Sequence, residues 1–125
     1  MIIDELAQHI HNQGIAVLGT SLFKSYLPES PDNCIAVIET GGNEPDHYIP
    51  TKKPTFQVMI RNTSYTTGRT ALDNIRSAFE ALVNSTVANG STYFYYILAN
   101  AEGGHLGRDE AGRDLFSINF RCLIR

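Results

Sequence analysis

Hydrophobic and polar residues alternate along the end of the chain. From residue 116 to residue 124 an apolar side chain falls at every second position, and mostly polar side chains lie between them. This alternation is typical of a strand with one buried face and one polar face. The glycine-containing run at residues 107–113 predicts a turn before it. We therefore place residues 113–125 inside a sheet as a paired strand.

Apolar residues at helical spacing predict two helices. The first covers residues 1–13, where Asp4 and Glu5 lie in the first turn that the helix dipole favours for acids. Gly14 is expected just beyond its end. The second helix covers residues 68–84 and carries a wide apolar stripe. A serine or threonine between positions 64 and 67 is expected to cap it.

Shorter apolar runs predict the remaining strands. They lie at residues 15–27 with a break near Gly19, at 34–39, at 55–62 and at 93–99, with a possible short strand around 105–107. Residues 40–54 and 100–112 read as two long polar loops. Long loops within a compact domain tend to be functional or disordered, and we expect residues 40–54 to be mobile in the isolated protein.

This order of elements predicts a single α+β domain over residues 1–125. The economical arrangement is a mostly antiparallel sheet of four or five strands, with two helices packed on one face. Several apolar side chains would then be left on the opposite face: Tyr93, Tyr95, Ile97, Ile35 and Val37. They either line an open apolar face or meet another subunit, and we favour the second alternative.

Composition narrows the classes of function. The chain is 42% hydrophobic and 18% charged with a net charge of -3, and its basic residues are scattered, so composition does not favour a polyanion binder. The sequence contains no apolar run of about 18 residues, so no membrane span is expected. Its first residues do not resemble a secretory signal. Cys34 and Cys122 fall in apolar strands and are expected to be buried thiols, with a disulfide as the alternative.

The histidines do not form a convincing metal site. His9 and His11 are two apart on a helix and point about 160° away from each other, whereas a helical metal site needs a spacing of four. His47 and His105 have the acidic neighbours Asp46 and Glu102 in the two long loops. A shared zinc site is conceivable there, but solvated loop histidines are the simpler interpretation. Nothing else indicates a catalytic or cofactor site, so we expect no enzyme.

Two segments, the charged residues 108–114 and the aromatic residues 93–99, can be interpreted either as ordinary structure or as a binding surface. Asp109, Glu110 and Asp114 stand among Arg108 and Arg113, either as a solvated charge cluster or as a subunit contact whose charges set the register. The tyrosines in residues 93–99 could stack on nucleic-acid bases, but that strand contains no Lys or Arg, and the chain is acidic. Nucleic-acid binding by this strand is therefore not favoured.

Three segments together resemble a known family. They are residues 56–61 followed by Ser64 and Tyr65, the helix at 68–82, and the Gly-Arg-Asp-Glu-Ala-Gly-Arg run at 107–113 followed by 116–120. In this order and spacing they are similar to the small minor capsid or tail-terminator proteins of tailed bacteriophages and prophages. The resemblance extends over about residues 1–125 in length and order of elements.

The resemblance implies a structural role without catalysis, cofactor or metal. Such proteins form hexameric rings that end the tail tube and offer a surface to the head-completion or connector protein, while DNA passes through without sequence-specific binding. This implies assembly in the bacterial host cytoplasm, a place at the head–tail junction of the virion, and no membrane. An acidic balance would suit a channel through which DNA slides.

By position in their elements, six residues are candidates for contacts with other subunits or the tail: Arg61, Tyr65, Arg69, Arg108, Asp109 and Arg113. Reversing the charge of Arg113 is expected to weaken ring formation while the monomer stays folded. Two alternatives remain open. One is a head-completion or connector protein of similar size, and the other is a small α+β ligand-binding or enzymatic domain that uses the concave face of the sheet.

Overall fold

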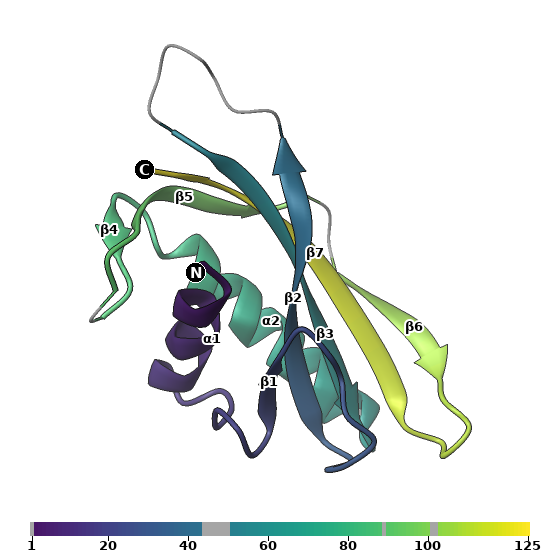
Figure 1. Cartoon of the computed structure of the whole chain (residues 1–125). Coiled ribbons are helices and arrows are strands. Elements are labelled where there is room, and N and C mark those ends of the chain that lie inside the picture. Colours follow the sequence, from purple (N-terminus) through teal and green to yellow (C-terminus); the bar gives the residue numbers. More distant parts are fainter. Residues whose placement is uncertain (1, 44–50, 89, 101–102) are drawn as a thin grey trace.

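The computed structural model describes residues 2–43, 51–88, 90–100 and 103–125, which form two helices and seven strands (Figure 1). In chain order they are α1 (Ile2–Asn12), β1 (Leu22–Lys24), β2 (Cys34–Asn43), β3 (Lys53–Asn62), α2 (Tyr65–Glu80), β4 (Ser85–Thr86), β5 (Tyr93–Ala99), β6 (Gly104–Arg108) and β7 (Asp114–Ile124). The strands form one sheet in the order β1-β2-β3-β7-β5-β4, and β6 also pairs with β7.

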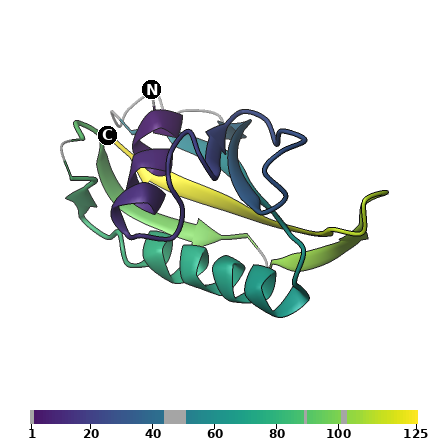
Figure 2. The same cartoon turned by 90° about the horizontal axis from the view of Figure 1, so that it is seen from below.

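The predicted sheet of four or five mostly antiparallel strands with two helices on one face is wrong. The sheet has seven strands and is mixed, because β1 pairs parallel with β2, and it curls into a half-barrel. Register shifts in β2, β5 and β6 disturb its ladders, and such bulges bend and twist strands. Helix α2 lies along β3, β7 and β5, whereas α1 lies between α2 and the β1–β2 edge (Figure 2). Strands as short as β1 and β4 leave no periodic signal.

The two helices occupy the predicted segments, and Ser64 caps α2 by accepting a hydrogen bond from the Thr67 amide. The strand predicted at residues 15–27 shrinks to β1. The reason is local: the Val17 carbonyl accepts hydrogen bonds from the amides of Thr20, Ser21 and Leu22, so the chain turns there. Gly19 supplies the positive φ of +84° that this turn needs.

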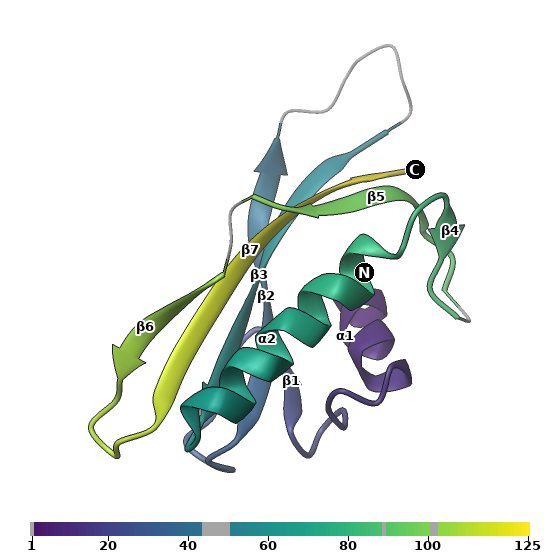
Figure 3. The ribbon, with the colours of Figure 1, turned by 180° about the vertical axis from the view of Figure 1, so that it is seen from behind.

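β7 lies at the centre of the sheet between β3 on one side and β5 and β6 on the other. Its predicted alternation is confirmed, because the five apolar side chains at alternate positions from Phe116 to Ile124 are all buried. We call the face that they occupy the helix face (Figure 3) and the opposite one the open face (Figure 1).

Three phenylalanines form the centre of the core on the helix face. The rings of Phe56 and Phe120 stack with centroids 5.1 Å apart, and Phe79 from α2 meets both rings edge-on at 5.3 Å. All three side chains are at most 2% exposed. Truncation of such a ring to alanine costs about 3–5 kcal/mol, so this cluster anchors α2 to the sheet.

Two expectations about the far side of the sheet need correction. Ile35, Val37 and Ile97 are buried in the core rather than left on the opposite face. The bulge between Phe94 and Tyr96 changes the phase of β5, so a strict two-residue alternation assigns its later residues to the wrong face.

The two predicted loops are also shorter than expected, because β2 runs on to Asn43, β3 begins at Lys53 and β6 fills residues 104–108. Residues 44–50 and 101–102, and with them His47, Asp46 and Glu102, lie outside the described residues.

Glycines allow two close contacts that position the end of the sheet. A side chain at Gly68, in the first turns of α2, would collide with the Phe116 ring of β7. A side chain at Gly103, just before β6, would lie 2.8 Å from Leu72 of α2 and 3.0 Å from Ile118 of β7. Both contacts draw the start of α2, β6 and β7 together at one end of the molecule.

Candidate functional site

All six residues proposed from the sequence lie at one end of the sheet, where β3 ends and β7 begins (lower part of Figure 1). Arg61 is near the end of β3, Tyr65 and Arg69 are in the first turns of α2, and Arg108 ends β6. Asp109 and Arg113 flank the turn into β7. The structure divides five of them between two polar clusters that differ in how many of their polar atoms have partners, and Arg69 belongs to neither.

The first group, which we call the arginine cluster, consists of Arg61, Arg113, Asp109 and Asp32. Arg113 Nη1 donates to the Glu29 carbonyl at 2.7 Å and lies 3.3 Å from Asp32 Oδ1, while its Nε donates to Asp109 Oδ2 at 2.8 Å. Its side chain is only 10% exposed. This arginine therefore holds the chain around residues 29–32 against the start of β7.

Arg61 acts in the same way on the same segment. Its Nη2 donates to the Pro31 carbonyl at 2.7 Å and its Nε to the Asp32 carbonyl at 3.1 Å, and the residue is 5% exposed. Hydrogen bonds from a charged group are worth more than neutral ones. Both arginines thus have their partners inside the chain, and their first role is to hold the fold.

Asp109 organises the turn between β6 and β7. Its Oδ1 accepts hydrogen bonds from the amides of Ala111 and Arg113, at 3.0 and 2.9 Å. These bonds, led by the Arg113 amide and followed by the Arg113 guanidinium, hold the pKa of the Asp109 carboxyl below its usual range. Among the described residues, this cluster is a closed network of charges and backbone groups.

The second group, which we call the histidine cluster, consists of Tyr65, His105, Arg108 and Asp114. Asp114 is buried, with a side chain 2% exposed, and its Oδ1 accepts from His105 Nε2 at 2.9 Å and from Arg108 Nε at 3.3 Å. The hydrogen bond from His105, and then that from Arg108, holds the pKa of the Asp114 carboxyl below its usual range. Asp114 Oδ2 has no hydrogen-bond partner among the described atoms.

The histidine cluster faces outward through its other members. The Arg108 side chain is 69% exposed and that of His105 is 32% exposed. Tyr65 is 50% exposed and packs edge-on against the His105 ring, with centroids 5.1 Å apart, above Phe116. The buried carboxylate therefore fixes an imidazole, a guanidinium and a phenol ring at the surface.

Arg69 belongs to neither cluster. Its Nη1 donates to the Gly103 carbonyl at 3.0 Å, which ties α2 to the start of β6, and it forms a long ion pair with Asp73 at 3.8 Å. It supports the position of His105 rather than contacting it.

The interpretation of Asp114 as a solvated surface charge is wrong. A signal was present, because Asp114 lies in the buried phase of the β7 alternation.

The chemical groups of the described chain do not assemble into a catalytic or metal centre. Both cysteines are free and buried, and burial raises the pKa of the Cys122 thiol to about 12 and also raises that of Cys34. Within the described ranges, no three metal-binding side chains gather. His9 and His11 make separate backbone contacts with Ala78 and Leu18. Neither described helix has the length and apolar character needed to span a bilayer.

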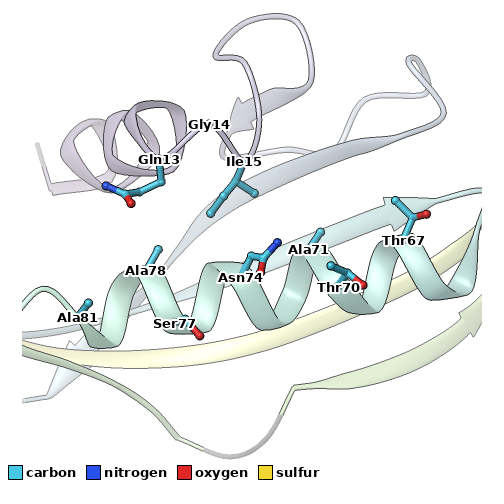
Figure 4. A pocket seen from close by; sticks show the side chains of 10 residues that line it. All are labelled: Gln13, Gly14, Ile15, Thr67, Thr70, Ala71, Asn74, Ser77, Ala78 and Ala81. Carbon is cyan, nitrogen blue, oxygen red and sulfur yellow. The ribbon is translucent and has the colours of Figure 1, made fainter.

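An open groove of about 590 Å³ runs between α2 and the chain just after α1 (Figure 4). The side chains that line the groove are small or uncharged: Gln13, Gly14, Ile15, Thr67, Thr70, Ala71, Asn74, Ser77, Ala78 and Ala81. None of these side chains titrates near neutral pH, so the groove offers no acid or base for catalysis. It does not favour the alternative of a small enzymatic domain.

Two of three comparisons with known proteins found a match. One solved structure, from the virion of a native gene transfer agent particle, matches with a TM-score of 0.60 and 14% identity over 95% of this chain and 83% of that chain. At this identity the likeness shows the fold alone. No curated protein matches the chain. The family model of the bacteriophage tail terminator protein matches residues 9–125, which shows that the chain belongs to this family and is a structural protein that joins the phage tail to the head.

Proposed function

We propose that this chain is the subunit of a hexameric ring that ends the tail tube and meets the head-completion or connector protein. The observation that carries the proposal is the family match over residues 9–125. The ring is assembled in the bacterial host cytoplasm and lies at the head–tail junction of the virion. DNA passes through it without sequence-specific recognition.

The histidine cluster is the proposed contact between neighbouring copies in this ring. Tyrosine and arginine are the side chains that most often dominate binding energy at interfaces, and Tyr65 and Arg108 are both exposed. His105 and Asp114 hold them in place, which lowers the entropy lost on binding.

The other candidates contribute to the ring by shaping this end of the sheet. Arg61, Asp109 and Arg113 order the 29–32 segment and the β6–β7 turn, and Arg69 fixes the start of β6.

Deleting the gene from the phage or prophage that carries it tests the role directly. The lysate is examined by negative-stain electron microscopy, with the intact gene supplied from a plasmid as the control. We expect filled heads that are separate from overlong or unjoined tails. Normal infectious particles without the plasmid would overturn the proposal.

The same lysate separates this role from that of a head-completion or connector protein. Headless tails of the correct length would indicate the joining role of that neighbouring protein, because tube length would then be set without this chain. Sedimentation of the purified protein, alone and with isolated tails, measures whether six copies assemble and whether a tail end is needed.

A further inference from the structure

The open face of the sheet has an unusual distribution of charge. On β3 and β7 the open-face positions alternate with the buried core residues, and pairing of Arg121 with Thr55 and with Leu98 aligns them across three strands. Five of the 10 basic residues lie at open-face positions of these strands or directly before or after β7: Lys53, Arg61, Arg113, Arg121 and Arg125. None of the 13 acidic residues occupies an open-face position on β3, β5 or β7.

The basic residues of this face divide into two sets. Arg61 and Arg113 are buried and are used by the arginine cluster. Lys53, Arg121 and Arg125 are exposed at the other end of the face, and none has a carboxylate partner among the described residues. Arg125 instead lies over the Tyr93 ring, 5.6 Å from its centroid.

Four of the five basic residues elsewhere on the molecule lie near a carboxylate, and Lys52 is the exception among the described residues. Lys24 pairs with Asp4 at 2.6 Å, Arg76 with Glu80 at 2.8 Å and Arg108 with Asp114 at 3.3 Å. In a chain with a net charge of -3, exposed cations without a carboxylate partner among the described residues are the exception, and three of these four, Lys53, Arg121 and Arg125, lie on the open face. Their concentration on one face therefore indicates a surface with a positive potential of its own.

Aromatic and aliphatic side chains stand beside these cations. Tyr93 and Tyr95 pack edge-on with ring centroids 5.0 Å apart, Tyr96 and Leu123 are half-buried, and Leu98 is 39% exposed. We call Lys53, Tyr93, Tyr96, Leu98, Arg121 and Arg125 the basic–aromatic patch. Protein–protein interfaces are enriched in tyrosine and arginine and depleted in Asp and Glu, and the patch has this composition. Three cations are few for a surface that binds nucleic acid.

We infer that the basic–aromatic patch docks on another virion protein, at a surface with an apolar centre and carboxylates around it. A second copy of this chain fits less well, because the exposed carboxylates that the structure describes are dispersed. They lie on α1, on the 29–32 segment, on β2, on α2 and in the β6–β7 turn. The inference rests on the proposed function, since it assigns the heterologous contact to the open face and leaves the histidine cluster for the ring.

The test uses tails and heads purified from the gene-deletion lysate, mixed separately with the purified protein and sedimented. Arg121→Gln/Arg125→Gln is compared with Lys24→Gln/Arg76→Gln, which removes the same charge from other faces. We expect wild-type binding to one of the two particles to fall as salt is raised from 50 to 300 mM. The patch variant should bind at least about 10-fold more weakly, and the control variant within about 2-fold of wild type.

Three results would contradict the inference in different ways. If the wild-type protein binds neither tails nor heads, the proposed function fails and the inference fails with it. If both variants bind the particle as wild type does, the function stands and the docking face is wrong. If the patch variant keeps particle binding but loses salt-dependent binding to a duplex DNA fragment, measured by fluorescence anisotropy, the patch is a DNA contact instead. Equal melting temperatures of the two variants serve as the folding control.

Discussion

The two polar clusters at the lower end of the sheet contain the same kinds of side chain but differ in what completes them. In the arginine cluster, Arg61 and Arg113 find their acceptors on the chain itself, at 2.7 to 3.3 Å. In the histidine cluster, one oxygen of the buried Asp114 carboxylate has no partner among the described residues, while Arg108 and Tyr65 extend into solvent. A charge that is satisfied internally serves the fold, and a charge held outward is ready for a partner.

This difference ranks the six sequence candidates. Arg61, Arg113 and Asp109 are committed to contacts within the monomer, so their substitution should first affect folding. Tyr65 and Arg108 should affect assembly first, and Arg69 stands between because its exposed guanidinium also holds Gly103. Each prediction below changes one cluster and asks whether stability or assembly responds.

Arg113→Glu should have the largest effect, and on the monomer. The substitution places a carboxylate beside Asp109 and Asp32 and frees the Glu29 carbonyl, so melting temperature and soluble yield should fall clearly. This revises the sequence-based expectation of a folded monomer with weakened ring formation. Thermal unfolding followed by circular dichroism measures it. A variant that melts like wild type and fails only to assemble would return the arginine cluster to the interface.

Arg61→Met should destabilise the monomer by about 2–4 kcal/mol, because it removes two charged hydrogen bonds to the carbonyls of Pro31 and Asp32 while keeping the buried aliphatic part of the side chain. Urea unfolding gives the free energy. The matched control is Arg76→Met in α2, where loss of the half-exposed pair with Glu80 should cost no more than about 1 kcal/mol. Equal losses at the two positions would show that the arginine cluster is not special.

The long periodic elements could be predicted from sequence because burial repeats along them. β7 and both helices follow a regular alternation or stripe over many residues. β1 and β4 are too short to show a period, and the bulge after Phe94 reverses the phase of β5 within one strand. Strand number and curl depend on such local features, so they were the part of the fold that was missed.

The sequence could group the candidate residues but not tell their contacts apart. The Gly-Arg-Asp-Glu-Ala-Gly-Arg run lies at one end of the sheet, and its two arginines fall in different clusters. Which arginine is buried depends on the 29–32 segment, which is about 80 residues away in the sequence. A long-range contact of this kind leaves no trace in the local spacing of charges.

Arg108→Glu should leave the monomer folded and weaken assembly. Its side chain is 69% exposed and shares Asp114 with His105, so the expected loss of stability is under about 1 kcal/mol. Ring formation, or binding to isolated tails, should fall at least about 10-fold because a charge at the contact changes sign. Arg76→Glu carries the same charge change far from the cluster and should assemble normally. Equal assembly by both variants would remove the histidine cluster from the ring contact.

Acid should produce the smallest effect, and in both clusters. The pKa values of Asp109 and Asp114 are lowered in the folded chain, Asp109 mainly by the Arg113 amide and Asp114 mainly by His105. A depressed carboxyl pKa adds stability above the unfolded value of about 3.9, and this contribution is lost as pH falls through the folded pKa. The contribution of these two carboxyl groups to the free energy of unfolding should therefore be constant from about pH 6 to pH 4.5 and should decline below about pH 4.

Asp109→Asn and Asp114→Asn should each flatten that decline, because an amide cannot take up the proton that the unfolded carboxylate binds. At neutral pH, Asp114→Asn replaces the carboxylate by an amide of nearly the same shape. One of the two polar atoms of the amide then occupies the position of Oδ2, which has no partner among the described atoms. This substitution should then separate the clusters: Asp114→Asn lets His105 and Arg108 move and weakens assembly, whereas Asp109→Asn acts on stability alone. If Asp109→Asn weakened assembly more than Asp114→Asn at equal stability, the roles of the two clusters would have to be exchanged.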